Sequence, residues 1–387
     1  MPKNDLGNKI SKAIRSVVGD GTKVLSEPFL RGNEKKYVIE CIDSGFISSV
    51  GKMVNLFEDN LRSFVGCKHT VAVSSGTAAL HIGLRCLDVG SGDEVLIPSL
   101  TFAATANAVL YCGASPIFID SELDTYGIDP LKVSDFLRKY TILKNNECIN
   151  RRTGKRIKAL ICTHVFGHPC RVEELLTLVN KFKIHLVEDA AAGIGSFVRS
   201  KHVGNFGSIG IFSFNGNKII STGGGGALVT QSSTLAKKAK HLSTTAKLNH
   251  PWLIKHDQMG FNYRLANINA AIGLAQLEQI QKIIKNKRAL VVEYKKAFLN
   301  IKECYIKEEI FGYKSNYWLQ CLVLRKGSIC YRNDILKYTN ENKIMTRPTW
   351  KPLHELPYLR AYHKSGMQNV GLIHKMLINI PSGPEIL

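Results

Sequence analysis

The chain has 387 residues, 44% of them hydrophobic and 21% charged, which is an ordinary composition for a folded protein and argues against disorder. Lys and Arg (52) outnumber Asp and Glu (31), giving a formal net charge of +21. This charge would attract nucleotides, nucleic acid or anionic membranes, although scattered lysine from a biased composition explains it equally well. We find no secretory signal and no apolar stretch of membrane-spanning length, so we expect a cytoplasmic protein without membrane insertion. The ten cysteines include no C-x-x-C pair, so free thiols are expected.

The first 24 residues are predicted to form a helical extension. Apolar residues at 10, 14, 17 and 18 follow a helical spacing, and glycines at 19 and 21 end it. We expect this helix to pack on the body of the protein rather than to serve as a targeting signal. Two more helices are predicted over 33–43 and 53–64, with Tyr37, Cys41 and Ile42 facing inward.

A strand, a turn of small residues and a helix are predicted over 71–87. The turn contains Ser75, Gly76 and Thr77. Free backbone N–H groups at a helix amino terminus, with two hydroxyls beside them, can hold a phosphate without Lys or Arg. An ordinary helix cap is the more frequent explanation of such a turn when it is considered alone.

Phe102 follows the next predicted strand. An aromatic ring in a loop after a strand can stack on a planar cofactor, although a core phenylalanine is the alternative. A helix is predicted over 129–140. The basic run at 151–158 is interpreted as a solvated turn, because it lacks the interleaved aromatic residues of an RNA-binding surface.

Cys162, His164, His168 and Cys170 have a spacing that resembles a metal site. Strand alternation turns Cys162 away from its neighbour, and Pro169 interrupts the second half, so we predict no metal here. His164 is instead expected to be a cleft residue at a strand end.

Asp189 and Lys218 are the main candidates for chemistry. Each follows an apolar run that is typical of a buried strand, and open α/β sheets place ligands at the carboxyl ends of such strands. A partly buried lysine loses its proton easily and can attack an aldehyde, while an aspartate can keep a pyridine nitrogen protonated. The pair therefore suits pyridoxal phosphate, and a buried ion pair without chemistry is the alternative.

A long helix is predicted after residue 260, with Ile268, Ile272, Ile280 and Ile284 on one stripe. It would link two domains. The sequence suggests an extension over 1–24, a large domain over 25–265, and the linking helix with a smaller α+β domain over 266–387.

Six motifs together resemble one family. They are SSGTAALH (74–81), PSLTFAATANA (98–108), VEDAA (187–191), FSFNGNK (212–218), GFNYRLANINAA (260–271) and NIPSG (379–383). From about residue 28 to its end, the chain resembles the DegT/StrS-type family of pyridoxal phosphate-dependent nucleotide-sugar aminotransferases. This resemblance implies the α/β fold of fold type I: a large domain with a mainly parallel seven-stranded sheet flanked by helices, and a smaller C-terminal α+β domain.

The resemblance also implies roles for individual residues. Lys218 would bond covalently to the cofactor and Asp189 would contact its ring nitrogen. The other implied cofactor contacts are stacking by Phe102, phosphate binding by Gly76, Thr77 and Ser213, and a contact from Asn262 to the phosphate in the neighbouring subunit. A homodimer with shared active sites follows from the last role.

Two positions depart from the family pattern. Ala192 stands where many members have Gln, Glu or His, and Gly224 stands where many have Glu. The first departure removes a cofactor contact, for which His164 is a candidate replacement. The second leaves the lysine chemistry intact.

Segments 32–38, 48–52, 244–252, 316–319 and 344–350 are most similar to one branch of this family. That branch aminates UDP-2-acetamido-4-keto-2,6-dideoxyhexoses on the way to bacillosamine and legionaminic-type sugars. It implies transfer of an amino group from L-glutamate to a sugar 4-ketone. Arg347, Tyr317 and Arg264 are candidates for substrate contacts.

Three other functions compete with this interpretation. A sugar dehydratase of the same fold is disfavoured, because such relatives have histidine where this chain has Lys218. A non-enzymatic regulator that binds pyridoxal phosphate would carry a DNA-reading domain, and no helix-turn-helix pattern is seen. A basic nucleic-acid-binding protein would show salt-sensitive binding to oligonucleotides, so nucleic acid is not an expected partner.

Overall fold

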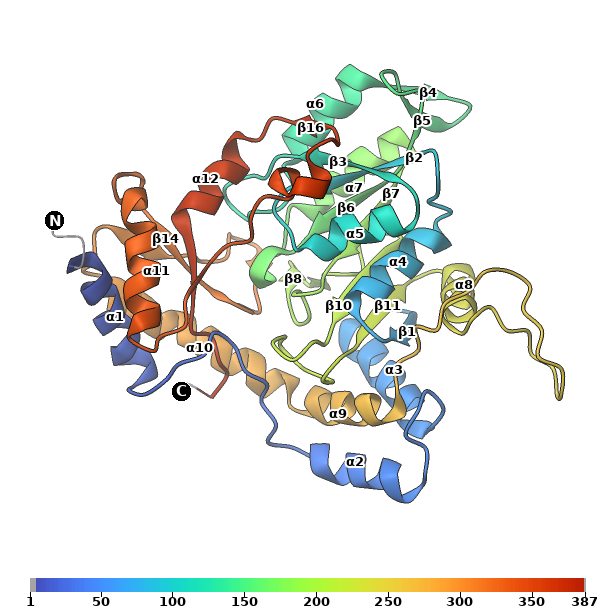
Figure 1. The fold of residues 1–387 in the computed structure, drawn as a ribbon, viewed down its shortest axis with the longest axis horizontal. Coiled ribbons are helices and arrows are strands. Elements are labelled where there is room, and N and C mark those ends of the chain that lie inside the picture. Colours follow the sequence, from blue (N-terminus) through green and yellow to red (C-terminus); the bar gives the residue numbers. More distant parts are fainter. Residues whose placement is uncertain (1–4, 386–387) are drawn as a thin grey trace.

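A computed structural model describes residues 5–385. A large sheet with helices packed around it makes up most of the structure (Figure 1). Its ten strands include the path β1-β11-β10-β7-β6-β2-β3-β16. The bounds along this path are β1 (His69–Val73), β11 (Gly226–Thr230), β10 (Ile209–Ser213), β7 (His185–Asp189), β6 (Arg156–Thr163), β2 (Asp93–Pro98), β3 (Ser115–Ile119) and β16 (Lys364–Ser365).

Neighbouring strands from β10 to β16 pair in parallel, whereas β11 is antiparallel to both β1 and β10. The predicted, mainly parallel seven-stranded sheet corresponds to the part of this path from β1 to β3, which is β1-β11-β10-β7-β6-β2-β3. The hairpin of β4 (Thr141–Lys144) and β5 (Glu147–Asn150) joins the edge of β6, and β16 adds a segment from the far end of the chain.

Both faces of the large sheet are buried, because its strands are apolar on both sides. In β1, Val71 and Val73 face one apolar cluster, and Ala72 faces another. This pattern is typical of parallel strands covered by helices on both faces. The covering and peripheral helices are α2 (Glu34–Asp43), α3 (Lys52–Val65), α4 (Gly76–Cys86), α5 (Ala103–Tyr111), α6 (Pro130–Tyr140), α7 (Val172–Phe182) and α8 (Ser233–Ser243).

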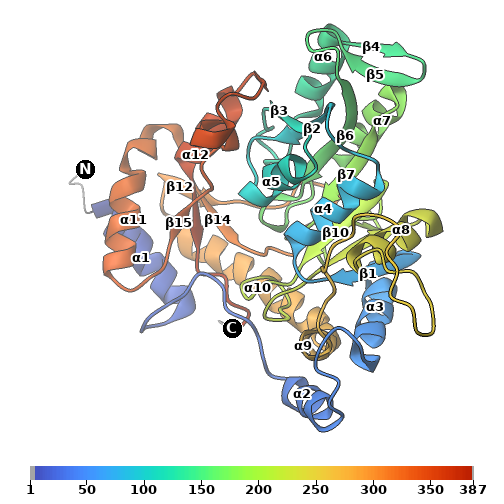
Figure 2. The same ribbon diagram turned by 45° about the vertical axis from the view of Figure 1, so that its right-hand side comes forward.

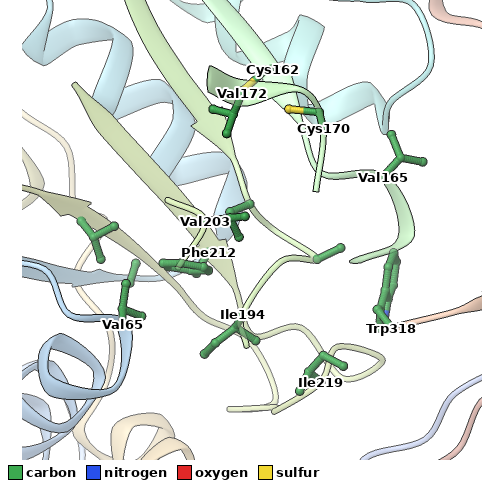
Figure 3. Close-up of a cluster of buried hydrophobic side chains, with 14 of the residues drawn as sticks. Val65, Cys162, Val165, Cys170, Val172, Ile194, Val203, Phe212, Ile219 and Trp318 are labelled. Atoms are coloured by element: carbon green, nitrogen blue, oxygen red, sulfur yellow. The ribbon is translucent and has the colours of Figure 1, made fainter. Parts of the chain in front are cut away.

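Figure 3 shows part of the larger apolar cluster, in which Phe212 of β10 and Val203 pack between the sheet and the loops beside it. Trp318 joins this cluster from the C-terminal part of the chain. A small three-stranded sheet of β8 (Phe197–Val198), β9 (Lys201–His202) and β13 (Tyr313–Lys314) also connects the two parts.

The smaller C-terminal part has its own antiparallel sheet, in the order β12-β14-β17-β15 (Figure 2). The strand bounds are β12 (Cys304–Ile306), β14 (Gln320–Leu324), β17 (Leu377–Ile380) and β15 (Arg347–Pro348), and the helices are α11 (Arg332–Glu341) and α12 (Gln368–Met376). Short 3₁₀ turns occur at Val165–Gly167, Lys326–Tyr331, Leu353–Glu355 and Pro357–Leu359.

Helix α1 (Asp5–Val18) lies against α10 (Ile280–Phe298) and against α11 of this smaller part. Leu6, Ile10 and Ile14 are buried in the same apolar cluster as the strands β12, β14 and β17. A Cβ atom on Gly7 would lie 3.0 Å from Cβ of Tyr338, so the two helices are in close contact. The helix therefore packs on the body of the protein, as expected, with its apolar side against the small domain.

The predicted linking helix is two helices, α9 (Asn267–Glu278) and α10 (Ile280–Phe298). Gln279 departs from helical geometry with φ −107° and ψ 0°, which separates them. Ile280 and Ile284 are buried as expected, but Ile268 and Ile272 are only half-buried, so the proposed single stripe is wrong for α9. The buried side of α9 contains small residues such as Gly273, which lies against Phe57.

Within residues 5–385, no helix is both long and apolar enough to cross a membrane. All ten cysteines are free thiols, as expected, and Cys330 is the exposed one among them.

Candidate active site

A pocket of about 360 Å³ opens where several strands of the large sheet end. Thr163 ends β6, Asp189 ends β7 and Ser213 ends β10, and all three line it. The amino terminus of α4 forms a second side. The small domain closes the pocket with Trp318, Arg347 and Trp350. The pocket therefore lies between the two domains.

Asp189 is held as an oriented carboxylate in this pocket and is only 5% exposed. Its Oδ2 atom accepts a hydrogen bond from Thr105 Oγ1 at 2.7 Å, and Oδ1 accepts one from the Ala191 amide at 3.2 Å. Thr105 is also paired with Thr101, whose Oγ1 accepts a hydrogen bond from Thr163. A run of hydroxyls from three elements therefore fixes the acid.

Lys218 follows β10 in a turn in which its amide donates to the carbonyl of Asn215. Its Nζ atom lies 3.8 Å from the ring centroid of Trp318. Burial lowers the pKa of Lys218 from 10.5 to about 8, and the charge of Asp189 opposes part of that shift. About a tenth of Lys218 is thus uncharged at pH 7, far more than for an ordinary lysine, and the uncharged amine is the nucleophilic form.

The amino terminus of α4 is shaped to hold an anion. Ser75 caps the helix by accepting a hydrogen bond from the Ala78 amide at 3.0 Å. The amides of Gly76 and Thr77 have no acceptor among residues 5–385. A Cβ atom at Gly76 would lie 2.8 Å from Cβ of Ser213, so glycine permits the helix end to approach β10. Free amides and hydroxyls at a helix amino terminus are a phosphate site.

Phe102 and Arg347 lie at the mouth of the pocket. The Phe102 ring is 60% exposed, and its centroid lies 6.4 Å from that of Trp350. The ring is therefore available to stack on a ligand rather than being part of the core. Arg347 forms no ion pair within the described part of the chain, so its guanidinium group can bind an incoming anion.

His164 lines the pocket, but both of its ring nitrogens bond to groups within the protein. Nε2 lies 3.2 Å from Glu188 Oε2, and Nδ1 accepts a hydrogen bond from the Cys170 amide at 3.2 Å. His164 is therefore not placed to supply a hydrogen bond in place of the side chain missing at Ala192. Asn316 instead supports that turn, since its amide group donates to the carbonyls of Ala192 and Ile194.

The expectation that Pro169 keeps the second half of the Cys/His motif away from the first is wrong for Cys170. One ligand atom from each of Cys162, His164 and Cys170 lies within 4.8 Å of the others, because the loop after β6 returns Cys170 to the strand. Burial raises the pKa of the Cys170 thiol, but the hydrogen bond from the Cys162 thiol and the nearby His164 outweigh it and lower that pKa to about 6. His168 is apart from this cluster, packs edge-on against Tyr317, and has no partner for Nε2 in the described residues.

Three other predicted site residues do not line this pocket. Tyr317 is buried, and its hydroxyl accepts a hydrogen bond from the Glu309 amide, so its expected substrate contact is wrong for this pocket. Arg264 is exposed beside β1 and pairs with Val73 through backbone atoms. Asn262 is also exposed and lies outside its own chain's pocket.

Sequence reasoning missed Thr105 and the site role of Trp318. The hydroxyl of Thr105 is one helical turn from the Thr101–Phe102 loop, and only the fold brings it to Asp189. Trp318 directly follows Tyr317, but it is Trp318 that faces Lys218.

Comparison with known proteins identifies the family. The model of the DegT/DnrJ/EryC1/StrS aminotransferase family matches residues 28–387. EpsN of Bacillus subtilis is 39% identical over 334 residues, which are 86% of this chain and 82% of EpsN. GDP-perosamine synthase of Escherichia coli O157:H7 is 37% identical over 365 residues, or 93% of each chain.

A solved structure of PseC from Helicobacter pylori, an aminotransferase of pseudoaminic acid biosynthesis, superposes with a TM-score of 0.85 at 25% identity. It covers 94% of this chain and 95% of its own. The pocket's lysine, buried acid and anion-binding helix end fit pyridoxal phosphate, which is the cofactor of this family. The chain therefore belongs to the DegT/DnrJ/EryC1/StrS aminotransferase family.

Proposed function

We propose that this enzyme transfers an amino group from L-glutamate to the 4-keto carbon of a nucleotide-linked 4-keto-6-deoxy sugar. The substrate that we favour is a UDP-2-acetamido-4-keto-2,6-dideoxyhexose, used to make a surface glycan or glycoprotein sugar. The observation that carries the proposal is the convergence of Lys218, Asp189 and the α4 amino terminus on one pocket, with Arg347 at its mouth and without an ion pair to any residue between 5 and 385. The GDP-linked product in the name of the E. coli relative makes GDP-sugars the second class to test.

Each wall of the pocket would hold one part of the cofactor. Ser75, Gly76, Thr77 and Ser213 would bind its phosphate, and Phe102 would stack on its ring. Asp189 would accept a hydrogen bond from the protonated ring nitrogen, with the Thr105 hydroxyl keeping the carboxylate in place. When bound, pyridoxal phosphate supplies an aldehyde for the amine and an electron-withdrawing ring that makes the adjacent C–H acidic.

Lys218 would act in two ways. Its uncharged amine would bond to the aldehyde carbon of the cofactor, and once released Nζ would accept and return the proton that moves during the reaction. A pKa of about 8 suits both tasks, because the amine can gain and lose a proton near neutral pH. Trp318 covers Nζ and limits its contact with water.

Arg347 would bind the anionic part of each substrate in turn. In a reaction where donor and acceptor use the same pocket at different times, one guanidinium group can serve the carboxylate of glutamate and then the sugar nucleotide. Arginine suits both, because its planar fork matches carboxylate and phosphate oxygens.

A homodimer would complete the site. Ile42, expected to face inward, is 58% exposed on α2, and Ile39, Phe46 and Ile47 are exposed beside it. The loop between α8 and α9 projects from the body (Figure 1) and exposes Trp252 at 79%. Apolar surface of this extent is typical of a subunit interface, and Asn262, at the base of the projecting loop, would reach a partner's phosphate site.

The test is to incubate the purified chain with pyridoxal phosphate, L-glutamate and a panel of UDP-, GDP- and dTDP-linked 4-keto sugars. Product masses should show one ketone oxygen replaced by an amine, with formation of 2-oxoglutarate. Lys218→Arg keeps the charge but should abolish turnover, and Lys326→Arg, on the surface of the small domain, is the matched control. The proposal would be contradicted if the Lys218→Arg variant formed an amine product. It would also be contradicted if the wild-type chain formed no amine product from any sugar in the panel.

A further inference from the structure

The buried cluster of Cys162, His164 and Cys170 is not needed for the chemistry proposed above. It lies at the end of β6 and in the loop that follows, behind the part of the pocket wall formed by Thr163 and His164. All three side chains are buried, and Figure 3 shows Cys162 and Cys170 side by side. We propose that Cys162, Cys170 and the Nδ1 atom of His164 bind a thiophilic divalent cation, for which Zn²⁺ is the natural probe.

The first argument is the spacing of the donor atoms. Two sulfur atoms and one imidazole nitrogen lie within 4.8 Å of one another. Around tetrahedral Zn²⁺, bonds of about 2.3 Å to sulfur and about 2.1 Å to nitrogen bring ligand atoms to about 3.6–3.8 Å from one another, up to about 1 Å closer than this. A small inward movement of the three side chains would therefore form a site of the Cys₂His type.

The second argument is the environment of His164. A histidine that binds a metal through one nitrogen almost always donates its other N–H to a carboxylate or carbonyl. Nε2 of His164 lies 3.2 Å from Glu188 Oε2, and the lone pair of Nδ1 accepts a hydrogen bond from the Cys170 amide at 3.2 Å. The lone pair is thus directed at Cys170, and a bound cation would replace this amide hydrogen bond.

Glu188 is held firmly enough for this orienting role. Its carboxylate accepts hydrogen bonds from the amides of Gly204, Phe206 and Gly207 at 2.6–2.8 Å. With those bonds and His164, its oxygens are occupied, so Glu188 would orient the histidine rather than bind the cation. The protein then supplies three ligands and leaves one position of a tetrahedral site open.

The third argument is charge. A cation that binds here displaces the protons of the two thiols, so two thiolates can be neutralised by one divalent ion in a buried place. The cation would join the end of β6 to the loop that carries Cys170. Thr163 and His164 lie between Cys162 and Cys170 in the sequence, and both line the pocket. The bound cation would therefore stabilise this part of the pocket wall.

The experiment is to produce the full chain in medium supplemented with Co²⁺, which gives intense sulfur-to-metal absorption bands at thiolate sites. We expect stoichiometric Co²⁺ with these bands in the wild-type chain, and their loss in both Cys162→Ser and Cys170→Ser. Cys321→Ser is the matched control, since Cys321 is equally buried but belongs to the small domain, and it should keep the bands.

The wild-type spectrum decides the proposal even if a variant fails to fold. Absence of the bands in the wild-type chain would overturn it. Loss of the bands to the same extent in Cys321→Ser would also overturn it. So would a disulfide between Cys162 and Cys170, found when metal-free protein is digested without reductant, because such a disulfide would identify the two cysteines as a redox couple.

Discussion

The ionisation of Lys218 offers the most direct test of the site. Burial lowers its pKa from 10.5 to about 8, while the negative charge of Asp189 raises it. At about pH 7.5, roughly a quarter of the lysine would be uncharged, compared with about one in a thousand for an ordinary lysine. The structure thus increases the reactive form by roughly 200-fold. Asp189→Asn removes the opposing charge and should shift the pKa of Lys218 still lower.

Competitive acetylation of the cofactor-free chain measures this pKa without relying on enzyme activity. Short pulses of acetic anhydride between about pH 6 and pH 11, followed by mass spectrometry of the Lys218 peptide, give the midpoint at which the amine becomes reactive. We expect a midpoint near 8 in the wild-type chain and a lower one in Asp189→Asn. A wild-type midpoint near 10.5, or an upward shift in Asp189→Asn, would refute the reasoning.

Three further predictions concern other parts of the structure. Thr105→Val removes a hydrogen bond to the Asp189 carboxylate that is worth about 1.5–3 kcal/mol. The affinity for the cofactor, measured by absorbance, should therefore fall by about 10- to 100-fold. Thr105→Ser keeps the hydroxyl and should keep the wild-type affinity. Gly76→Ala would force its Cβ against Ser213, at a cost of about 1–3 kcal/mol, and should weaken binding of pyridoxal phosphate more than that of pyridoxal; equal weakening would argue against a phosphate role for this turn. Burial lowers the pKa of Lys287 from 10.5 to about 7 in the folded chain. Between these two pH values the unfolded chain binds one more proton at this lysine than the folded chain does. Lys287 therefore makes the free energy of unfolding rise with pH in that range, by about 1.4 kcal/mol per pH unit. Urea unfolding at several pH values should show this slope reduced in Lys287→Met, and an unchanged slope would contradict the assignment.

The sequence was most informative where the chemistry lies at strand ends. Asp189 and Lys218 each follow an apolar run, and parallel pairing of β7 with β10 brings those ends together. The helix start at Ser75 was equally predictable, because small polar residues before an apolar helix are a local signal.

Features that depend on the return path of a loop were not predictable in the same way. Strand alternation correctly describes Cys162 within β6, but it says nothing about where the chain after Pro169 places Cys170. Likewise, an apolar residue such as Ile42 looks like a core residue by helical spacing, although it lies on an exposed face of α2. Periodicity identifies an apolar face, and it does not say whether the same chain or a second copy covers it.

Trp318 explains why the two domains must be considered as one site. Its ring lies over Nζ of Lys218, and its indole N–H donates to the Asn217 carbonyl at 2.6 Å, in the turn that carries the lysine. Its own carbonyl accepts a hydrogen bond from the buried Lys287 of α10, which also binds the carbonyl of Ser382. Helix α10 therefore helps to position the residue that shields Nζ of Lys218 from water. Because desolvation is the main cause of the lowered pKa of Lys218, the packing of the small domain against the large sheet contributes directly to the reactivity of the lysine.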